Sequence, residues 1–150
     1  MKVQIKSIYI ALVFLLPASA NSAEWIVVSD SQEKISQIEI SSMKQISKNV
    51  FKFWFRETFS TVQTESKLSS APQFDTVKFL YAVDCNENRL AWMRSIYTLD
   101  GNVTFSSENS DVKSIQFDDV VPDSVGESYA NAACKIAKYN KSEASAKNKK

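Results

Sequence analysis

The chain has 150 residues, 44% of them hydrophobic, and its 18 basic and 17 acidic side chains leave a formal net charge of +1. This near balance gives no indication of nucleic-acid binding, which normally needs a clustered basic surface. The sequence contains no histidine, which excludes Ser-His-Asp triads and the commonest metal ligand, and its two glycines are too few for a phosphate-binding glycine-rich loop.

The first predicted element is a secretory signal peptide over residues 1–20. Two lysines precede an apolar core over residues 8–16, and the small-residue triplet at 18–20 has the composition of a cleavage site. The core is too short to cross a bilayer, which takes about 20 apolar residues. We predict cleavage after Ala20, with an uncleaved anchor or a buried helix as the alternative. Loss of the two lysines would leave 16 basic and 17 acidic side chains, a net charge of −1.

The region after the signal peptide predicts strands of alternating character broken by polar turns. Residues 25–28 and 34–40 are expected to form the first two strands, and the polar residues 41–49 an irregular segment with at most one helical turn. Residues 49–59 form the strongest predicted strand. Its core side has Phe51, Phe53, Phe55 and Phe59, and its other side has Lys52, Trp54 and Arg56. Residues 60–72 predict a long, mobile connection without packing of its own.

Residues 76–84 and 89–98 are predicted to pair around a turn at residues 86–88, in one of two registers. A two-residue turn directs Leu90, Trp92 and Ile96 to the core, together with Val77, Phe79 and Tyr81. A three-residue loop with a left-handed Asn88 directs Ala91, Met93 and Tyr97 there instead. Trp92 is therefore a core residue in the first register and exposed in the second.

The last elements are a turn, two short strands and a helix. Residues 100–102 have turn composition, and strands are expected at 103–105 and, at an edge, 115–117. A helix over residues 124–138 begins with a capping box formed by Ser124 and Glu127. Its stripe facing the sheet is expected to comprise Val125, Tyr129, Ala132 and Ile136. The Lys-rich residues 140–150 are predicted to be a disordered tail, which leaves 21–139 as one domain.

The two cysteines, Cys85 and Cys134, most simply form one disulfide in an exported chain. Cys134 lies at the edge of the apolar arc of the helix, where it could reach Cys85 at the end of its strand. Two buried thiols and an intermolecular bridge are the alternatives. An intramolecular bridge closing a loop of about 50 residues would contribute about 4 kcal/mol in the chain-entropy model.

Several motifs occur in a fixed order over nearly the whole mature domain, roughly residues 24–138. They are Trp25, the Phe-Trp-Phe strand at 53–55, Val83-Asp84-Cys85, the segment YTLDG at 97–101, PDSVGE at 122–127 and Ala133-Cys134. In this order the chain resembles the bacterial surface-adhesin protein E family. The resemblance implies an α+β fold, in which a twisted antiparallel sheet of about six strands packs against the C-terminal helix and a disulfide ties the two together.

The resemblance also implies an exported bacterial protein, since the characterised relative is an adhesin that binds host matrix and plasma proteins such as vitronectin and laminin. That adhesin is a lipoprotein, whereas no cysteine follows the signal core here. We therefore predict a periplasmic or secreted chain with no stable membrane anchor. An exposed sheet edge could pair two copies into a homodimer.

The candidate binding surface is the outward side of the central strands, where Lys52, Trp54 and Arg56 alternate. Tryptophan and arginine are favoured interface anchors. In the second register, this surface would also contain Lys78, Leu80, Trp92 and Arg94. The alternative is a structural role, because basic side chains lying over tryptophans give cation–π contacts of about 0.5–1 kcal/mol without any function.

No catalytic, metal or cofactor site is predicted. Asp118, Asp119 and Asp123 are close in sequence, but their spacing matches no calcium loop. The leading hypothesis is therefore a non-enzymatic exported protein that binds other proteins, among them host matrix or plasma proteins. The alternatives are a periplasmic inhibitor or accessory protein for an exported enzyme or assembly, and a hydrolase that uses two carboxylates.

Overall fold

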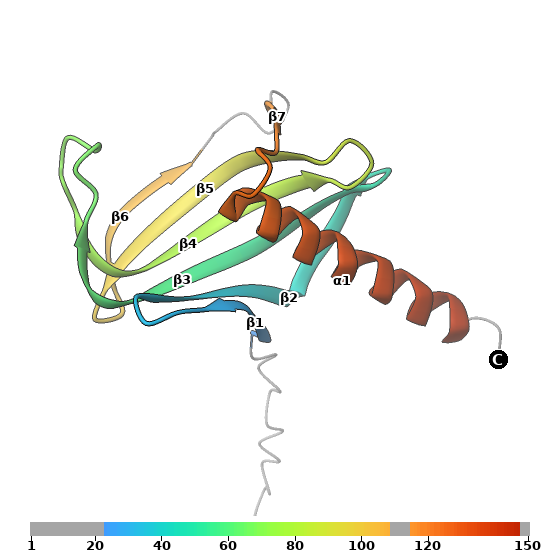
Figure 1. Cartoon of the computed structure of the whole chain (residues 1–150), viewed down its shortest axis with the longest axis horizontal. Coiled ribbons are helices and arrows are strands. Elements are labelled where there is room, and N and C mark those ends of the chain that lie inside the picture. Colours follow the sequence, from blue (N-terminus) through green and yellow to red (C-terminus); the bar gives the residue numbers. More distant parts are fainter. Residues whose placement is uncertain (1–22, 109–114, 148–150) are drawn as a thin grey trace, which may run out of the picture.

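The structure, a computed structural model, describes residues 23–108 and 115–147. Six strands lie in the sheet in chain order, each antiparallel to the next: β1 (Trp25–Asp30), β2 (Lys34–Ser47), β3 (Val50–Thr64), β4 (Gln73–Asp84), β5 (Arg89–Leu99) and β6 (Asn102–Glu108). The short β7 (Asp118–Asp119) pairs with β5, and the helix α1 (Val125–Lys147) crosses one face of the sheet (Figure 1). The predicted fold class is confirmed. The predicted signal peptide lies outside the described residues.

The main core lies between α1 and the centre of the sheet. Phe53 and Phe55 are fully buried there, as the alternation in β3 predicts, and the Tyr129 ring stacks on Phe55 with 3.9 Å between ring centroids. Ala130 and Ala133 of the helix are also fully buried. Their small side chains let the helix lie close to the aromatic rings, so this packing combines large sheet residues with small helix residues.

A second apolar cluster lies on the part of the sheet that the helix does not cover. It shows that the long, mobile connection predicted at residues 60–72 is wrong. β3 continues to Thr64, so the connection to β4 comprises only residues 65–72. Leu68 of this connection packs against the cluster, whose buried members are Phe74, Val77 and Tyr97. The prediction failed because the polar composition of the segment conceals one apolar anchor.

β2 also continues further than expected, because the irregular segment predicted at 41–49 is strand as far as Ser47. The register with β3 shifts between Glu39 and Lys44, so a bulge absorbs the extra residues. The Glu39 carboxylate accepts hydrogen bonds from the backbone N–H groups of Ser41 and Ser42. A side chain thereby replaces the partners that the interrupted ladder lacks, which local polarity alone does not reveal.

The β4–β5 hairpin combines the two predicted registers. The last pair is Asp84 with Arg89, and Asn88 is left-handed with φ of 52°. Before the bulge at Met93, Trp92 pairs with Tyr81 on the helix side of the sheet, as in the first register. Beyond the bulge, Tyr97 pairs with Val77 on that side, as in the second register. An inserted residue reverses the side-chain alternation, so neither register holds for the whole strand.

The start of α1 follows the prediction with one change. Glu127 N–H donates to Ser124 Oγ over 3.2 Å, but the Glu127 carboxylate accepts from the N–H of Asp123 instead of that of Ser124. The expected stripe is rotated. Val125 is 51% exposed, and the buried helix residues are Tyr129, Ala130, Ala133 and Ala137.

The helix continues through Lys147, past the expected end at residue 138 and into the segment expected to be disordered. Extending an established helix costs little when the added residues include strong helix formers such as Ala, Lys and Glu. Residues 148–150 of the predicted tail lie outside the described part of the chain.

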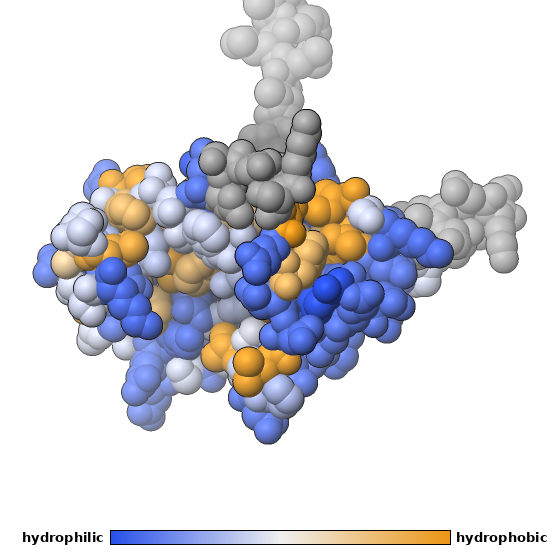
Figure 2. Space-filling model, turned by 90° about the horizontal axis from the view of Figure 1, so that it is seen from above, coloured by the Kyte–Doolittle hydropathy of each residue, from blue (hydrophilic) through white to orange (hydrophobic). Residues whose placement is uncertain are grey.

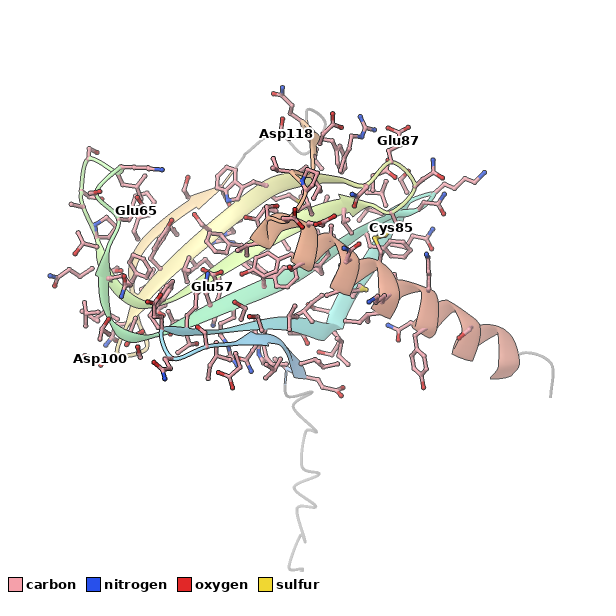
Figure 3. All side chains as sticks on the ribbon, viewed as in Figure 1. Glu57, Glu65, Cys85, Glu87, Asp100 and Asp118 are labelled. Carbon is pink, nitrogen blue, oxygen red and sulfur yellow. A yellow bond between two sulfur atoms is a disulfide. The ribbon has the colours of Figure 1, made fainter. Side chains whose placement is uncertain are left out.

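The disulfide between Cys85 and Cys134 is confirmed, and it ties the end of β4 to the middle of α1, as Figure 3 shows at the label of Cys85. The last edge strand lies at 118–119 instead of 115–117. Ile115 and Phe117 instead pack against Met93 and its neighbours on the face of the sheet away from α1. They were misread because an apolar pair in a loop has the same short pattern as a strand.

Candidate functional site

The candidate site is on the outer face, the face of the sheet opposite α1. Strand register places two rows of side chains side by side across this face. The first row contains Trp25, Glu39, Trp54, Leu80 and Arg94, and the second contains Val27, Gln37, Arg56, Lys78 and Ile96. The structure thus brings Trp54 and Arg56 onto one face with Lys78, Leu80 and Arg94, whereas Trp92 lies on the helix side.

Arg56 is held in place by two neighbours. Its guanidinium lies over the Trp25 ring, 4.2 Å from the ring centroid. Its Nε and Nη2 atoms donate hydrogen bonds of 3.0 and 2.7 Å to Gln37 Oε1. Burial lowers the pKa of Arg56, but an arginine stays charged at neutral pH. The cation–π contact expected on this face therefore exists, with Trp25 as the aromatic partner.

A cavity of about 420 Å³ opens beside these residues, and we call it the outer cleft. Its apolar lining consists of Trp25, Trp54, Ile96 and Ala23, and its polar lining of Glu39, Ser41, Ser42 and Lys78. The lining comes from strands β1 to β5, so residues far apart in sequence meet here. Trp25, Glu39 and Ile96 were missed as site residues because only the long-range register of the strands brings them to Trp54.

Glu39 lies below the outer cleft as a structural carboxylate. It is 3% exposed and accepts N–H hydrogen bonds from Glu24 at 3.2 Å, Ser41 at 2.9 Å and Ser42 at 2.7 Å, besides one from the Ser41 hydroxyl. Burial by itself would raise the pKa of Glu39, but these hydrogen bonds outweigh it and the pKa is lowered. The carboxylate is therefore charged and fully engaged by the protein.

The outer face concentrates positive charge. Lys44 lies directly opposite Lys52, and Arg56 directly opposite Lys78, so two cross-strand pairs have like charges. Within residues 23–108 and 115–147, neither Lys52 nor Lys78 forms an ion pair. Like charges directly opposite each other destabilise a sheet. This arrangement costs stability in the isolated protein.

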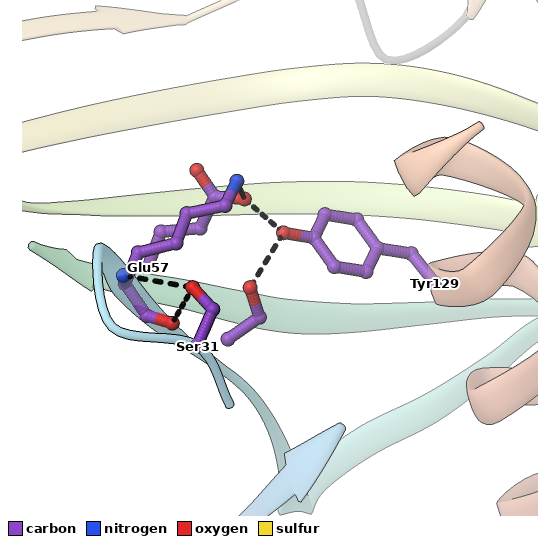
Figure 4. Close-up of polar contacts among 5 residues, drawn as sticks. Ser31, Glu57 and Tyr129 are labelled. Atoms are coloured by element: carbon purple, nitrogen blue, oxygen red, sulfur yellow. Dashed lines mark hydrogen bonds and ion pairs between the residues drawn. The ribbon is translucent and has the colours of Figure 1, made fainter. Parts of the chain in front are cut away.

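A second polar cluster lies on the helix side (Figure 4). The Tyr129 hydroxyl donates to the Glu57 carboxylate and forms a 3.4 Å hydrogen bond with Ser36, and Lys34 Nζ is 2.6 Å from Glu57 Oε1. Burial, followed by the hydrogen bond to Glu57, raises the pKa of Tyr129. The cluster fixes α1 on the sheet. A glutamate at a core position between Phe55 and Phe59 was the signal in the sequence.

The acidic residues labelled in Figure 3 come from different parts of the fold. Glu57 lies within the sheet, Glu65 and Asp100 lie towards one end of it, and Glu87 and Asp118 lie towards the other end (Figure 3). Among the described residues, no group of three or more His, Cys, Asp and Glu side chains could hold a metal ion.

Exposed apolar side chains are dispersed over several elements. They include Ile26, Val62, Trp92, Val103 and Val121. On the side shown in Figure 2, hydrophobic surface forms separate patches among hydrophilic side chains. Exposure alone therefore singles out no site. Ile26 also lines a second cavity, of about 460 Å³, between β1 and α1. The outer cleft differs from that cavity in its two tryptophans. No helix in the described part of the chain is long and apolar enough to cross a membrane.

An antiparallel meander covered by one helix and tied to it by a disulfide defines a small α+β protein whose described residues hold no metal cluster. A sequence model of the Surface-adhesin protein E family matches residues 25–135, and the chain belongs to this family. The match includes β1 to β6 and most of the packed part of α1. No curated protein and no solved structure matches the chain significantly.

Proposed function

We propose that this chain is an exported, non-enzymatic binding protein whose ligands are other proteins, and that the outer face is its binding surface. Membership of an adhesin family supports export and a role at the cell surface. The observation that carries the choice of surface is the outer cleft, where Trp54 lies in a concave site beside Arg56 and Lys78. Tryptophan and arginine in a concave, partly desolvated site are typical of binding hot spots.

The test is retention of host matrix and plasma proteins by the immobilised protein. A Trp54→Ala, Arg56→Ala variant should lose most of the retained protein, because truncation of hot-spot residues typically costs more than about tenfold in affinity. The matched control is Trp92→Ala, which removes a 38% exposed tryptophan from the other side of the sheet. Equal retention by the wild-type protein and the double variant would refute the choice of surface.

Export by cleavage after Ala20 belongs to the same proposal and is tested separately. Mass spectrometry of the protein from periplasmic and culture fractions should find Asn21 as the first residue, without an attached lipid. A chain found only in the periplasm would instead support an inhibitor or accessory protein for an exported bacterial enzyme or assembly. Unbiased co-purification under non-reducing conditions would then identify the bacterial partner.

A further inference from the structure

The ligand chemistry of the outer cleft can be read from its lining and its charges. We infer that the cleft takes a large apolar or aromatic side chain from an acidic peptide segment of a partner protein. This inference deepens the proposed function and rests on it. It concerns Trp25, Trp54, Ile96 and the cations beside them.

The shape and lining of the cleft favour an apolar anchor. Its volume of about 420 Å³ is within the range of ligand sites, which is about 300–1,000 Å³. Two indole rings, the Ile96 side chain and Ala23 form its apolar lining. An apolar side chain placed between them would be removed from water wherever it contacts these walls, which favours binding. A charged group would lose its hydration there, which opposes binding.

Two of the strongest hydrogen-bonding groups in and beside the cleft have little capacity left for a neutral saccharide, whereas the Ser42 hydroxyl, which has no partner among the described residues, and Lys78 keep theirs. Sugar hydroxyls need side-chain acceptors and donors with unused capacity. The Glu39 carboxylate is occupied by backbone N–H groups and a hydroxyl of its own chain. The Arg56 guanidinium already donates twice to Gln37. A peptide anchored by burial of one side chain makes smaller demands on these groups.

The charges predict the residues that flank this anchor. Arg56 of β3 and Lys78 of β4 lie directly opposite each other beside the cleft, and Lys44 of β2 and Lys52 of β3 form a second like-charge pair on the same face. Carboxylates of a partner placed between the members of each pair would relieve the repulsion that the isolated protein bears. The like-charge pairs, which destabilise the free protein, would therefore favour binding of an anionic ligand. We expect the partner segment to be rich in Asp and Glu.

The experiment measures binding of short fluorescein-labelled peptides to the purified, disulfide-bonded protein. The probe has one phenylalanine flanked on both sides by glutamates. One control peptide has lysines in place of the glutamates, and another has alanine in place of the phenylalanine. We expect only the probe to bind, with an affinity that falls as salt is added. A shift in tryptophan emission should accompany binding, since the probe contains no tryptophan.

Lys78→Glu is the most informative variant. It should weaken binding of the probe by about tenfold or more, because it replaces attraction by repulsion at the cleft. The same change should raise the melting temperature of the free protein, because it converts a like-charge cross-strand pair with Arg56 into an opposite-charge pair. Loss of binding in a more stable protein cannot be ascribed to misfolding. Lys135→Glu, on the exposed surface of α1, is the matched control and should leave binding unchanged.

Each result decides the inference. Equal binding of the probe to wild type and Lys78→Glu, or equal binding of the alanine peptide, would overturn it. So would a heparin oligosaccharide that binds the outer face while the probe does not. If host proteins are retained through Trp54 and the probe fails to bind, this inference is wrong and the proposed function stands. If the probe binds as expected but host proteins are not retained, host binding is wrong and the cleft still selects acidic peptides.

Discussion

Replacement of Tyr129 by phenylalanine tests whether the polar cluster under α1 stabilises the fold. Tyr129→Phe keeps the ring that stacks on Phe55 and removes only the hydroxyl that bonds to Glu57 and Ser36. A hydrogen bond to a charged group contributes about 1.5–3 kcal/mol. We therefore expect the free energy of unfolding at pH 8 to fall by about 2 kcal/mol.

The pH dependence gives a sharper signature. Because burial and Glu57 raise the pKa of Tyr129 above the ordinary value of 10.0, the folded protein keeps a proton that the unfolded chain releases. Stability from this group is complete below pH 10 and is lost as the pH rises further, by about 1.4 kcal/mol per pH unit. Tyr129→Phe lacks this loss. Because the unfolded tyrosine is already half ionised at pH 10, the stability deficit of the variant should shrink by about 1 kcal/mol between pH 10 and pH 11.

Urea unfolding followed by tryptophan fluorescence at pH 8, 10 and 11 measures both effects. Subtraction of the variant from wild type removes the contributions of the other titrating groups. Parallel pH profiles for wild type and Tyr129→Phe would refute the burial of a neutral hydroxyl against Glu57. Tyr81, whose pKa burial raises to about 12, should show the same behaviour when replaced by phenylalanine.

Three further outcomes are expected. Glu39→Gln should destabilise the protein by about 1–3 kcal/mol at pH 7. Because the pKa of Glu39 is lowered below 4.5, this difference should begin to shrink as the pH falls below 4.5 and vanish only below the lowered pKa of the folded protein, which acid titration of stability would measure. Reduction of the Cys85–Cys134 bridge, which spans 49 residues of chain, should cost about 4 kcal/mol, measured by urea unfolding with and without reductant. Gly126→Ala should raise stability by about 0.5 kcal/mol, measured by thermal unfolding, because the added Cβ would meet Leu90 Cδ1 at an ordinary 3.6 Å.

The candidate site shows where sequence-based prediction stops. Alternation along β3 suffices to place Lys52, Trp54 and Arg56 on one side, since side chains of a strand point alternately to opposite faces. The partners of Trp54 come from four other strands, and their identity depends on inter-strand register. Trp25 and Ile96 could not be assigned to the site, because nothing local to either residue reports which residue lies opposite.

The sequence by itself determined the elements that depend on local pattern: the phenylalanine face of β3, the start of α1 at Ser124 and the turn at Gly101, where φ is 78°. Only the tertiary structure decided what depends on pairing. Because of the single inserted residue at Met93, Trp92 lies on the helix side although Arg94 lies on the outer face. Hydrogen bonds to the Glu39 carboxylate stabilise β2 where it continues through a polar segment. Side-chain alternation is a local property of each strand, whereas register and bulges are set by contacts between strands distant in sequence.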